Sequence, residues 1–261
     1  MENADFAHRY GPVALITGAS SGIGRAFAEQ LAARGLDLIL VARREERLQF
    51  IAQQLQRHFG VTVNICPVDL AGGDAAQTIL EATGTLDIGL VVSNAGFGYK
   101  GAFETGPAQL MTDMLAVNCH APTQLAHGFV PRLKRRGRGG LIFTASVEGL
   151  IGCPYSAVYS ATKGYMTSLG EALWAELSPE GIDVLTLCPG ATDTEALDRH
   201  GIDRASLQSL MPADDVARLA LDNMREGPTY IPSEHYKASF GRLLAMPRRE
   251  ALMAMAKSMK P

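Results

Sequence analysis

The chain has few of the features that mark metal-binding, disulfide-bonded, membrane or nucleic-acid-binding proteins. Its four cysteines lie far apart and form no C-x-x-C pair, so we expect buried, reduced thiols and neither a zinc site nor a disulfide framework. No stretch approaches the ~18 uninterrupted apolar residues of a membrane-spanning helix. The net charge of −3 is small, which gives no reason to expect a nucleic-acid partner.

The beginning of the chain also lacks a targeting signal. Residues 1–5 read Met-Glu-Asn-Ala-Asp, which is acidic and has no apolar core of a signal peptide. No Pro/Ser-rich linker or block of charge divides the chain that follows. We therefore expect a cytoplasmic protein with a single domain over residues 1–261 and no bound metal.

Short apolar runs alternate with longer amphipathic segments along the whole chain. Such alternation is typical of βαβ units with a parallel sheet. The apolar runs are continuous, which indicates strands that are covered on both faces. Helical patterns lie between them, for example at Ile23–Arg34, Glu45–His58 and Tyr155–Leu177. The predicted strands are Val13–Thr17, Asp37–Ala42, Thr62–Pro67, Ile88–Val92, Gly140–Thr144 and Asp183–Cys188.

The turn after the first predicted strand carries a glycine pattern that suits a dinucleotide. It reads Thr-Gly-Ala-Ser-Ser-Gly-Ile-Gly over residues 17–24, and a predicted helix follows it. Glycine permits a tight turn, and the helix N-terminus offers free N–H groups and a positive dipole end to a pyrophosphate. A plain βα turn of small residues is the alternative. The predicted contacts are Gly18, Ser20, Ser21, Gly22, Ile23 and Gly24.

The end of the second predicted strand indicates which nicotinamide cofactor fits. NAD binders of this kind place an acidic residue here for the ribose 2′-hydroxyl, whereas NADP binders use a nearby arginine. Ala42 occupies the acidic position, and Arg43 and Arg44 follow it. A guanidinium can bind a 2′-phosphate through two hydrogen bonds, although both arginines could instead be solvated residues that open the next helix. We predict that NADP(H) is preferred over NAD(H).

Tyr159 and Lys163 stand four residues apart in a helix-compatible segment, so they share one helix face. A free phenol has a pKa of ~10, and a neighbouring ammonium lowers it toward the range in which general acid–base catalysis works best. We predict Tyr159 as the catalytic acid. Tyr155 is a competing candidate, but the residue four positions after it is Tyr159 and not a lysine. We interpret Tyr155 as structural or as a wall of the substrate cleft.

Together, the glycine-rich turn and this pair resemble the short-chain dehydrogenase/reductase family, and the resemblance extends to about residue 232. Further motifs match in order, namely Asp69-Leu70, Asn94-Ala95-Gly96, Asn118, Ser146, and Pro189-Gly190 with Thr192 and Thr194. The resemblance implies a doubly wound, Rossmann-type α/β domain with a parallel seven-stranded sheet and helices on both faces. Its seventh strand would be Pro228–Pro232. It also implies a homodimer or homotetramer, formed through the helices that hold Asn118 and Tyr159.

The resemblance further implies a role for each matched residue. Ser146 would bind the carbonyl oxygen, Tyr159 would exchange the proton, and Lys163 would lower the tyrosine pKa and hold the nicotinamide ribose. Asn118 would support a water-mediated proton relay. The implied cofactor contacts are Arg43, Arg44, Asp69, Leu70, Asn94, Ala95, Gly96, Tyr159, Lys163, Pro189, Gly190, Thr192 and Thr194. The implied activity is that of an NADPH-dependent carbonyl reductase or alcohol dehydrogenase.

We expect the substrate to be a small or lipophilic ketone or aldehyde, or a secondary alcohol. Its identity is not readable from the sequence and depends on three segments, 96–103, 148–155 and about 193–210. The last is predicted as a substrate-side loop or short helix. Their apolar side chains would either line a pocket or pack in the core: Phe97, Tyr99, Phe103, Leu150, Ile151 and Tyr155. A 3-oxoacyl- or steroid-type reductase is an alternative within enzymes. A non-catalytic NADP(H)-binding sensor or scaffold is the alternative outside them.

Residues from about 233 to 261 form a C-terminal extension rich in methionine, leucine and arginine. An amphipathic basic segment can lie on a membrane surface or cover an apolar substrate. More often it packs on its own domain or on a partner subunit, and this is the interpretation we prefer. No transmembrane span is expected, and peripheral membrane contact by the extension is the minor alternative.

Overall fold

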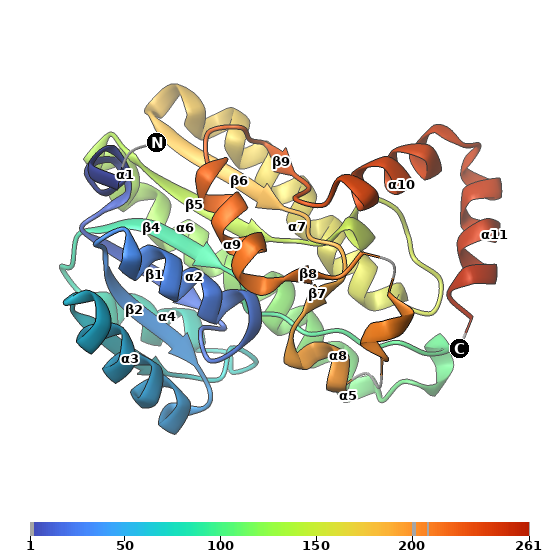
Figure 1. Ribbon diagram of the computed structural model, residues 1–261, viewed down its shortest axis with the longest axis horizontal. Coiled ribbons are helices and arrows are strands. Elements are labelled where there is room, and N and C mark those ends of the chain that lie inside the picture. The colour runs from blue at the N-terminus through green and yellow to red at the C-terminus, as the bar shows by residue number, and fades with distance from the viewer. Residues whose placement is uncertain (1–2, 200–201, 208, 261) are drawn as a thin grey trace.

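The computed structural model describes residues 3–199, 202–207 and 209–260. Within them, seven parallel strands form one sheet in the order β3-β2-β1-β4-β5-β6-β9 (Figure 1). The predicted Rossmann-type α/β fold is therefore confirmed. The six strands predicted from the apolar runs are present with their ends displaced by at most one residue. The strands of the sheet are β1 (Val13–Thr17), β2 (Asp37–Ala42), β3 (Val63–Pro67), β4 (Ile88–Ser93), β5 (Gly139–Thr144), β6 (Ile182–Leu187) and β9 (Thr229–Tyr230).

Helices connect these strands and cover both faces of the sheet (Figure 1). The α-helices of the described residues are α1 (Asn3–Tyr10), α2 (Gly22–Ala33), α3 (Glu45–Phe59), α4 (Ala75–Thr83), α5 (Ala108–Leu115), α6 (Ala121–Arg136), α7 (Ala157–Leu177), α8 (Glu195–Arg199), α9 (Ala213–Asp222), α10 (Glu234–Ala245) and α11 (Arg248–Ser258). Shorter turns are the 3₁₀-helices η1 (Phe103–Thr105), η3 (Val147–Gly149), η4 (Ser178–Glu180) and η5 (Arg204–Ser206), and the π-helix η2 (Ala116–His120).

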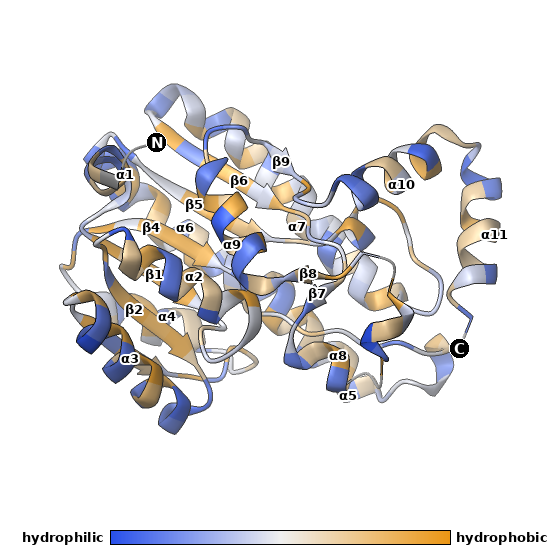
Figure 2. Cartoon of the chain, viewed as in Figure 1, coloured by the Kyte–Doolittle hydropathy of each residue, from blue (hydrophilic) through white to orange (hydrophobic). Residues whose placement is uncertain are grey.

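Two apolar cores lie on the two faces of the sheet. Successive side chains of a strand point to opposite faces, so Leu15 belongs to one core and Ile16 to the other. The first core includes side chains of α4, α6 and α7, and the second includes those of α1, α2, α3 and α9. This arrangement explains why the strands are mostly apolar, and β1 and β2 are largely orange in Figure 2.

The strand order reverses between β1 and β4, the neighbours at the centre of the sheet. In open parallel sheets, ligands bind outside the carboxyl ends of the strands near such a point. The glycine-rich turn, Arg43, Asn94, Ser146 and Pro189 each follow the end of a different strand. The topology therefore brings the predicted site residues to one edge of the sheet.

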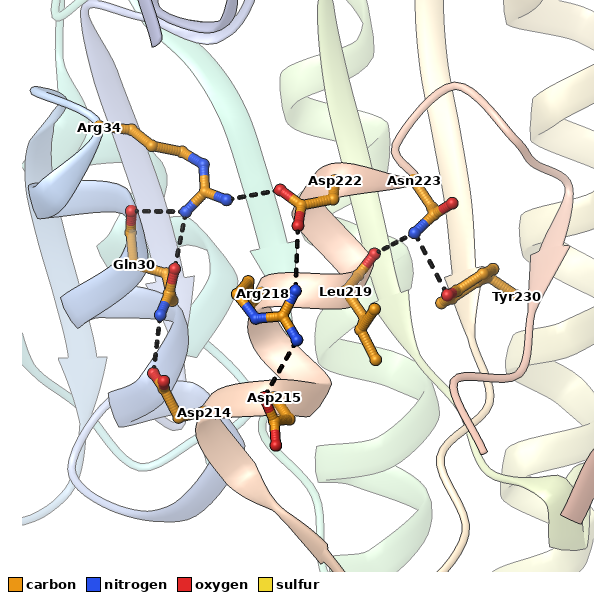
Figure 3. A network of polar contacts seen from close by, with 9 residues as sticks. All are labelled: Gln30, Arg34, Asp214, Asp215, Arg218, Leu219, Asp222, Asn223 and Tyr230. Carbon is orange, nitrogen blue, oxygen red and sulfur yellow. Dashed lines mark hydrogen bonds and ion pairs between the residues drawn. The ribbon is translucent and has the colours of Figure 1, made fainter. Parts of the chain in front are cut away.

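A polar network fixes α2, the helix that follows the glycine-rich turn, to α9 (Figure 3). Arg34 of α2 donates to Asp222 of α9 at 2.7 Å, and Gln30 donates to Asp214 at 2.8 Å. From the end of α9, Asn223 donates to the hydroxyl of Tyr230 in β9 at 3.2 Å. α2 is thus tied to α9, and the end of α9 is in turn tied to β9.

The segment that was predicted as a substrate-side loop or short helix contains both. Thr192–Asp193 (β7) and Met211–Pro212 (β8) pair as a separate two-stranded sheet. Between them lie α8 and η5, while residues 200, 201 and 208 are outside the described residues. Arg204 holds this segment together through ion pairs with Asp193 and Asp198.

The C-terminal extension forms α10 and α11, drawn in red in Figure 1. Phe240, Ala251 and Met255 are buried in the same apolar core as β5 and α7, so the extension packs on its own domain. Leu244 and Met253 remain 47% and 59% exposed. No helix in the described part of the chain is long and apolar enough to cross a membrane. Residue 261 lies outside the described residues.

Gly170 allows α7, which carries Tyr159 and Lys163, to lie close to β6. A Cβ atom at this position would be 1.9 Å from Oγ1 of Thr186, which is fully buried. Threonine is branched at Cβ and has little rotamer freedom with which to move away. The helix therefore depends on glycine here for its distance from the sheet.

We expect Gly170→Ala to destabilise the protein by about 1–3 kcal/mol, because overpacking outweighs the ~1 kcal/mol that alanine gains in a helix. Denaturant unfolding measures this change. The added substitution Thr186→Ala restores space and recovers most of the loss, whereas Gly73→Ala, which meets no atom within 4 Å, serves as the control. An unchanged free energy of unfolding in Gly170→Ala would contradict the close-packing argument.

Candidate active site

Four predicted catalytic residues meet at the carboxyl edge of the sheet. Ser146 follows β5, Tyr159 and Lys163 lie one turn apart on α7, and Asn118 lies in the π-helix η2. The Nζ atom of Lys163 is 5.6 Å from the centre of the Tyr159 ring. A Cβ atom at Gly96 would touch both Oδ1 of Asn118 at 3.1 Å and Nζ of Lys163 at 3.2 Å. The structure thus brings all four together.

Ser146 is buried and held by the backbone around it. Its Oγ atom accepts a hydrogen bond from the N–H of Glu148 at 3.1 Å and donates to the carbonyl of Pro189 at 3.5 Å. A hydrogen bond with this serine lowers the pKa of Tyr159. Ser146 therefore links the end of β5, the Pro-Gly turn after β6 and the phenol on α7.

The pKa of Tyr159 is raised above its ordinary value. Burial is the largest cause, and the negative charge of Glu148 adds to it, while the bond with Ser146 opposes both. Sequence reasoning predicted a lowered pKa because of Lys163. The net direction is the reverse, since desolvation of a phenolate outweighs its favourable contacts. Tyr159 accordingly holds its proton at neutral pH and is arranged as a proton donor.

Lys163 is 4% exposed, and its Nζ atom donates to the carbonyl oxygen of Thr144 at 2.7 Å. Burial lowers the pKa of Lys163 to about 8, against the opposing effects of Cys119 and Cys188. The ammonium is therefore mostly charged at pH 7 and close to losing its proton. Gly149 lies close to the backbone of α7 at this residue, since a Cβ atom on Gly149 would be 2.6 Å from the carbonyl carbon of Lys163.

Asn118 connects the loop after β4 to α7. Its Nδ2 atom donates to the carbonyl of Phe97 at 2.9 Å and to Oγ1 of Thr162 at 3.0 Å, and its Oδ1 atom accepts from the N–H of Phe97 at 3.1 Å. The sequence predicted a helix here, and the structure has a π-helix between α5 and α6. Such one-turn π segments are frequent at functional sites, and this one directs Asn118 toward the neighbour of Lys163.

The glycine-rich turn has the geometry of an anion site. Gly18 and Gly22 have φ angles of +70° and +54°, which favour glycine. Oγ1 of Thr17 accepts the N–H groups of Asn94 and Ala95, both at 3.0 Å, and so fixes the turn to the loop after β4. The first N–H groups of a helix have no partner within it, and Ser21 makes no side-chain cap to those of α2. These donors fit the pyrophosphate of a dinucleotide.

The two arginines after β2 take different positions. Arg44 donates from Nε and Nη2 to Oγ of Ser20 at 3.2 and 3.0 Å, so its guanidinium lies against the glycine-rich turn. Arg43 is largely exposed, and its Nη1 atom lies 3.7 Å from Oδ2 of Asp69. Asp69 follows β3, and the next residue, Leu70, is buried. Sequence analysis predicted both arginines as cofactor contacts, with Arg43 directly after Ala42, whereas the structure places Arg44 nearer to the turn.

Sequence reasoning missed two charged residues beside Arg44. Arg47, one turn further along α3, and Glu195, the first residue of α8, form ion pairs across the site. Glu195 lies 3.0 Å from Arg44 and also pairs with Arg47. No local pattern could have found these contacts, because the pairs join positions 151 and 148 residues apart in the chain.

The Pro-Gly segment after β6 packs between the glycine-rich turn and the C-terminal extension. Thr192 donates to the carbonyl of Gly190 at 3.1 Å. A Cβ atom at Gly22 would lie 3.0 Å from Cγ2 of Thr194, and one at Gly190 would lie 2.0 Å from the ring of Tyr236 in α10. Tyr236 therefore lies directly on the turn predicted to hold the nicotinamide, a contact that the sequence did not indicate.

Tyr155 does not share the helix of Tyr159, because α7 begins two residues later at Ala157. Its φ angle is +59°, an uncommon conformation for a tyrosine, and its carbonyl accepts from the N–H of Gly101 at 2.8 Å. It joins two of the predicted substrate segments through its backbone. Of the apolar candidates there, Ile151 is buried in the core and Phe103 is 66% exposed.

The four cysteines are free thiols, as predicted. Burial raises the pKa of each of them, to about 12 for Cys153 and Cys188. Thiols with such pKa values are poor nucleophiles at neutral pH. The thiols are therefore poor candidates for the chemistry of this edge.

Comparison with known proteins supports the resemblance to the short-chain dehydrogenase/reductase family over most of the chain. The sequence profile of the short chain dehydrogenase family matches residues 12–204. A 7beta-hydroxysteroid dehydrogenase of Clostridium sardiniense is 30% identical over 254 residues, which are 97% of each chain. The solved structure of a short-chain dehydrogenase from Sphingobium yanoikuyae in complex with NADPH is 35% identical with a TM-score of 0.82, over 94% of this chain and 96% of that one.

One relative is described as lacking activity. The human inactive hydroxysteroid dehydrogenase-like protein 1 is 33% identical over 189 residues, which are 71% of this chain and 57% of that protein. This match covers 71% of the chain, whereas the match to the dehydrogenase from Clostridium sardiniense covers 97%. By fold, by motif order and by these similarities, the chain belongs to the short-chain dehydrogenase/reductase family of nicotinamide-dependent oxidoreductases.

Proposed function

We propose that this protein is an NADP(H)-dependent oxidoreductase that interconverts a carbonyl group and an alcohol. The observation that carries the proposal is the convergence of Ser146, Tyr159, Lys163 and Asn118 beside the glycine-rich turn. A binding protein would have no need of a protonated phenol beside a hydroxyl and a buried ammonium. Cytoplasmic location is part of the proposal, since cellular NADP is kept reduced there and favours carbonyl reduction.

Each residue has a distinct part in the proposed reaction. A bound nicotinamide supplies or accepts the hydride at the substrate carbon. Ser146 turns its single O–H from the Pro189 carbonyl, a weak partner at 3.5 Å, to the substrate oxygen and stabilises the charge that develops on it. Tyr159 gives its proton to that oxygen in reduction and takes one from the alcohol in oxidation.

Lys163 and Asn118 act through Tyr159. With a pKa of about 8, Lys163 is charged at neutral pH and favours the phenolate that forms when Tyr159 loses its proton. Its ammonium also carries donors that fit the ribose hydroxyls of the cofactor. Asn118 fixes the Phe97 backbone next to Gly96 and Lys163 and supports a proton relay through water at this point.

The charge around the glycine-rich turn supports NADP(H) over NAD(H). Ala42 leaves no carboxylate at the end of β2, while Arg43 and Arg44 provide guanidinium groups there. Arg44 is already bound to Ser20, so its donors face the turn that fits the pyrophosphate. The NADPH complex of the relative from Sphingobium yanoikuyae agrees with this preference.

For the substrate, a bulky apolar ketone or secondary alcohol of the steroid type agrees best with the comparisons. The relative from Clostridium sardiniense, a 7beta-hydroxysteroid dehydrogenase, matches over 97% of its length and 97% of this chain, which is more than the part that precedes the C-terminal extension. In this chain the extension places Tyr236 on Gly190, at the predicted nicotinamide turn. An apolar substrate would therefore lie between the 148–155 segment and α10.

A homodimer or homotetramer is also proposed. Leu115 on α5 and Tyr165 on α7 are 50% and 44% exposed, on the helices next to Asn118 and Tyr159. The hydroxyl of Tyr165 is hydrogen-bonded to Thr123 of α6 at 2.9 Å, so the two helix surfaces are continuous. A second copy that packs there would stiffen the helices that hold the site.

Replacing Tyr159 by Phe removes the proton donor and keeps the ring. We expect at least about 100-fold slower NADPH oxidation with ketones, aldehydes, quinones and ketosteroids, and largely unchanged NADPH binding. Tyr155→Phe is the matched control, because Tyr155 acts through its backbone and keeps near wild-type turnover. Wild-type turnover in Tyr159→Phe would rule out its role, and tight NADPH binding with no turnover by any protein would favour the sensor alternative.

Replacing Arg44 by Ala should weaken NADPH binding by about 10- to 100-fold, the usual range for losing hydrogen bonds to a charged group. Arg43→Ala should have a smaller effect, because Arg43 is more exposed and does not contact Ser20. Affinities for NADPH and NADH, measured by fluorescence titration, separate a 2′-phosphate contact from general damage. The distant Arg57→Ala is the control. Equal losses for both cofactors would contradict the proposed preference.

The lowered pKa of Lys163 makes stability depend on pH. The unfolded chain keeps the lysine proton up to about pH 10.5, whereas the folded protein releases it near pH 8. Between these values the unfolded state binds more protons, so wild type gains stability with rising pH relative to Lys163→Met, by at most ~1.4 kcal/mol per pH unit. Denaturant unfolding of both proteins at pH 7, 8 and 9 tests this, and parallel pH profiles would show that Lys163 titrates normally.

A further inference from the structure

Glu195 connects the substrate side of the site to the arginines of the cofactor side. It directly follows Thr194, at the start of α8, and its carboxylate reaches across to Arg44 at 3.0 Å and to Arg47. Arg44 donates at the same time to Ser20 in the glycine-rich turn. One carboxylate thus holds two guanidinium groups that lie beside the predicted phosphate site.

These contacts hold Thr194 and the start of α8 against the glycine-rich turn. Thr194 lies against Gly22, where a Cβ atom would be 3.0 Å away, and Glu195 continues the contact to Ser20 through Arg44. The side chains of Glu195, Arg44 and Arg47 are 38%, 42% and 54% exposed, so solutes can reach the cluster. Burial opposes the charge of Glu195, but bonds from Arg47 and Arg44 outweigh it and hold its pKa below the ordinary value.

A carboxylate and a phosphate make the same kind of two-pronged hydrogen bonds with a guanidinium. Two anions at one pair of arginines repel each other, since like charges at close range are unfavourable. A 2′-phosphate that binds Arg44 must therefore displace Glu195 or bind less tightly because of the repulsion between the two anions. A cofactor without the 2′-phosphate leaves the bridge as it is.

We propose that Glu195 occupies the guanidinium site of the cofactor 2′-phosphate, so that binding of NADP(H) exchanges Glu195 for phosphate at Arg44 and Arg47 and releases α8. The inference rests on the proposed preference for NADP(H). It makes Glu195 a specificity residue on the substrate side of the site, and it makes the position of α8 depend on which cofactor is bound.

The test compares two fragments of the cofactor, 2′,5′-ADP and 5′-AMP, which differ in the 2′-phosphate and lack the nicotinamide. Calorimetric titration of Glu195→Gln should show about threefold tighter binding of 2′,5′-ADP, the scale of an exposed ion pair, and unchanged binding of 5′-AMP. Glu195→Ala, which removes both acceptor oxygens, should show at least the same gain.

Asp198→Asn is the matched control. Asp198 lies on the same short helix but pairs with Arg204 inside its own segment, at 2.6 Å. Asp198→Asn should leave the affinities for 2′,5′-ADP and for 5′-AMP unchanged. If Asp198→Asn tightens 2′,5′-ADP as much as Glu195→Gln does, loosening of α8 explains the gain and the exchange at the arginines is refuted.

Hydrogen exchange followed by mass spectrometry gives a second readout, independent of activity. In wild type, 2′,5′-ADP should increase amide exchange in α8 and 5′-AMP should not, while Glu195→Gln should exchange faster without any ligand. Unchanged or slower exchange in α8 with 2′,5′-ADP would overturn the release of this segment.

The outcomes also separate this inference from the proposed cofactor preference. If wild type binds 2′,5′-ADP no more tightly than 5′-AMP, the NADP(H) preference itself is wrong. If wild type prefers 2′,5′-ADP but Glu195→Gln binds it with equal or lower affinity, the preference stands and the exchange of Glu195 for phosphate is refuted.

Discussion

The parallel direction of the strands is the constraint on which the site depends. Because every strand of the sheet ends at the same edge, residues from five connections meet without any long loop. Hydrogen bonding continues past the strand ends: Ala145 donates to Leu187 at 2.7 Å, and Val147 donates to Pro189 at 3.1 Å. Ser146 therefore lies in a backbone that is still paired on both sides of it. The reactive hydroxyl is placed by the sheet and needs little support from its own side-chain contacts.

The helix that carries Tyr159 and Lys163 is held to this edge by small residues. Gly149 faces the backbone of Lys163, and Gly170 faces Thr186, so α7 approaches the sheet closely near both the reactive end and the middle. The closeness has an electrostatic consequence, because it buries an ammonium and a phenol together. Burial favours the neutral form of each. The result is a pair in which the tyrosine keeps its proton and the lysine is close to giving one up.

The sequence predicted the fold well because the information is local. Continuous apolar runs on a two-sided sheet have a clear pattern, and the glycine-rich turn is defined by eight adjacent residues. The expected catalytic residues also meet. Ser146 follows a strand end, Tyr159 and Lys163 lie on α7, and Asn118 in η2 is hydrogen-bonded to Thr162 of α7. What the sequence could not predict depends on distant contacts or on net electrostatics. The direction of the Tyr159 pKa shift depends on burial by the whole domain, and the π-helix at Asn118 has no sequence signal.

The same reason applies to the arginines. Next to β2, Arg43 and Arg44 look equivalent, and only the fold shows that Arg44 lies between Ser20 and Glu195. Tyr236 on Gly190 is likewise a contact between a strand end and a helix far along the chain. In both cases a residue of the substrate side touches a turn of the cofactor side: Thr194 and Glu195 at the glycine-rich turn, and Tyr236 at the Pro-Gly turn. Under the proposed function, cofactor binding and substrate binding would share side chains in this protein. A change at either turn would then alter the shape of the other half of the site and couple the choice of cofactor to the access of the substrate.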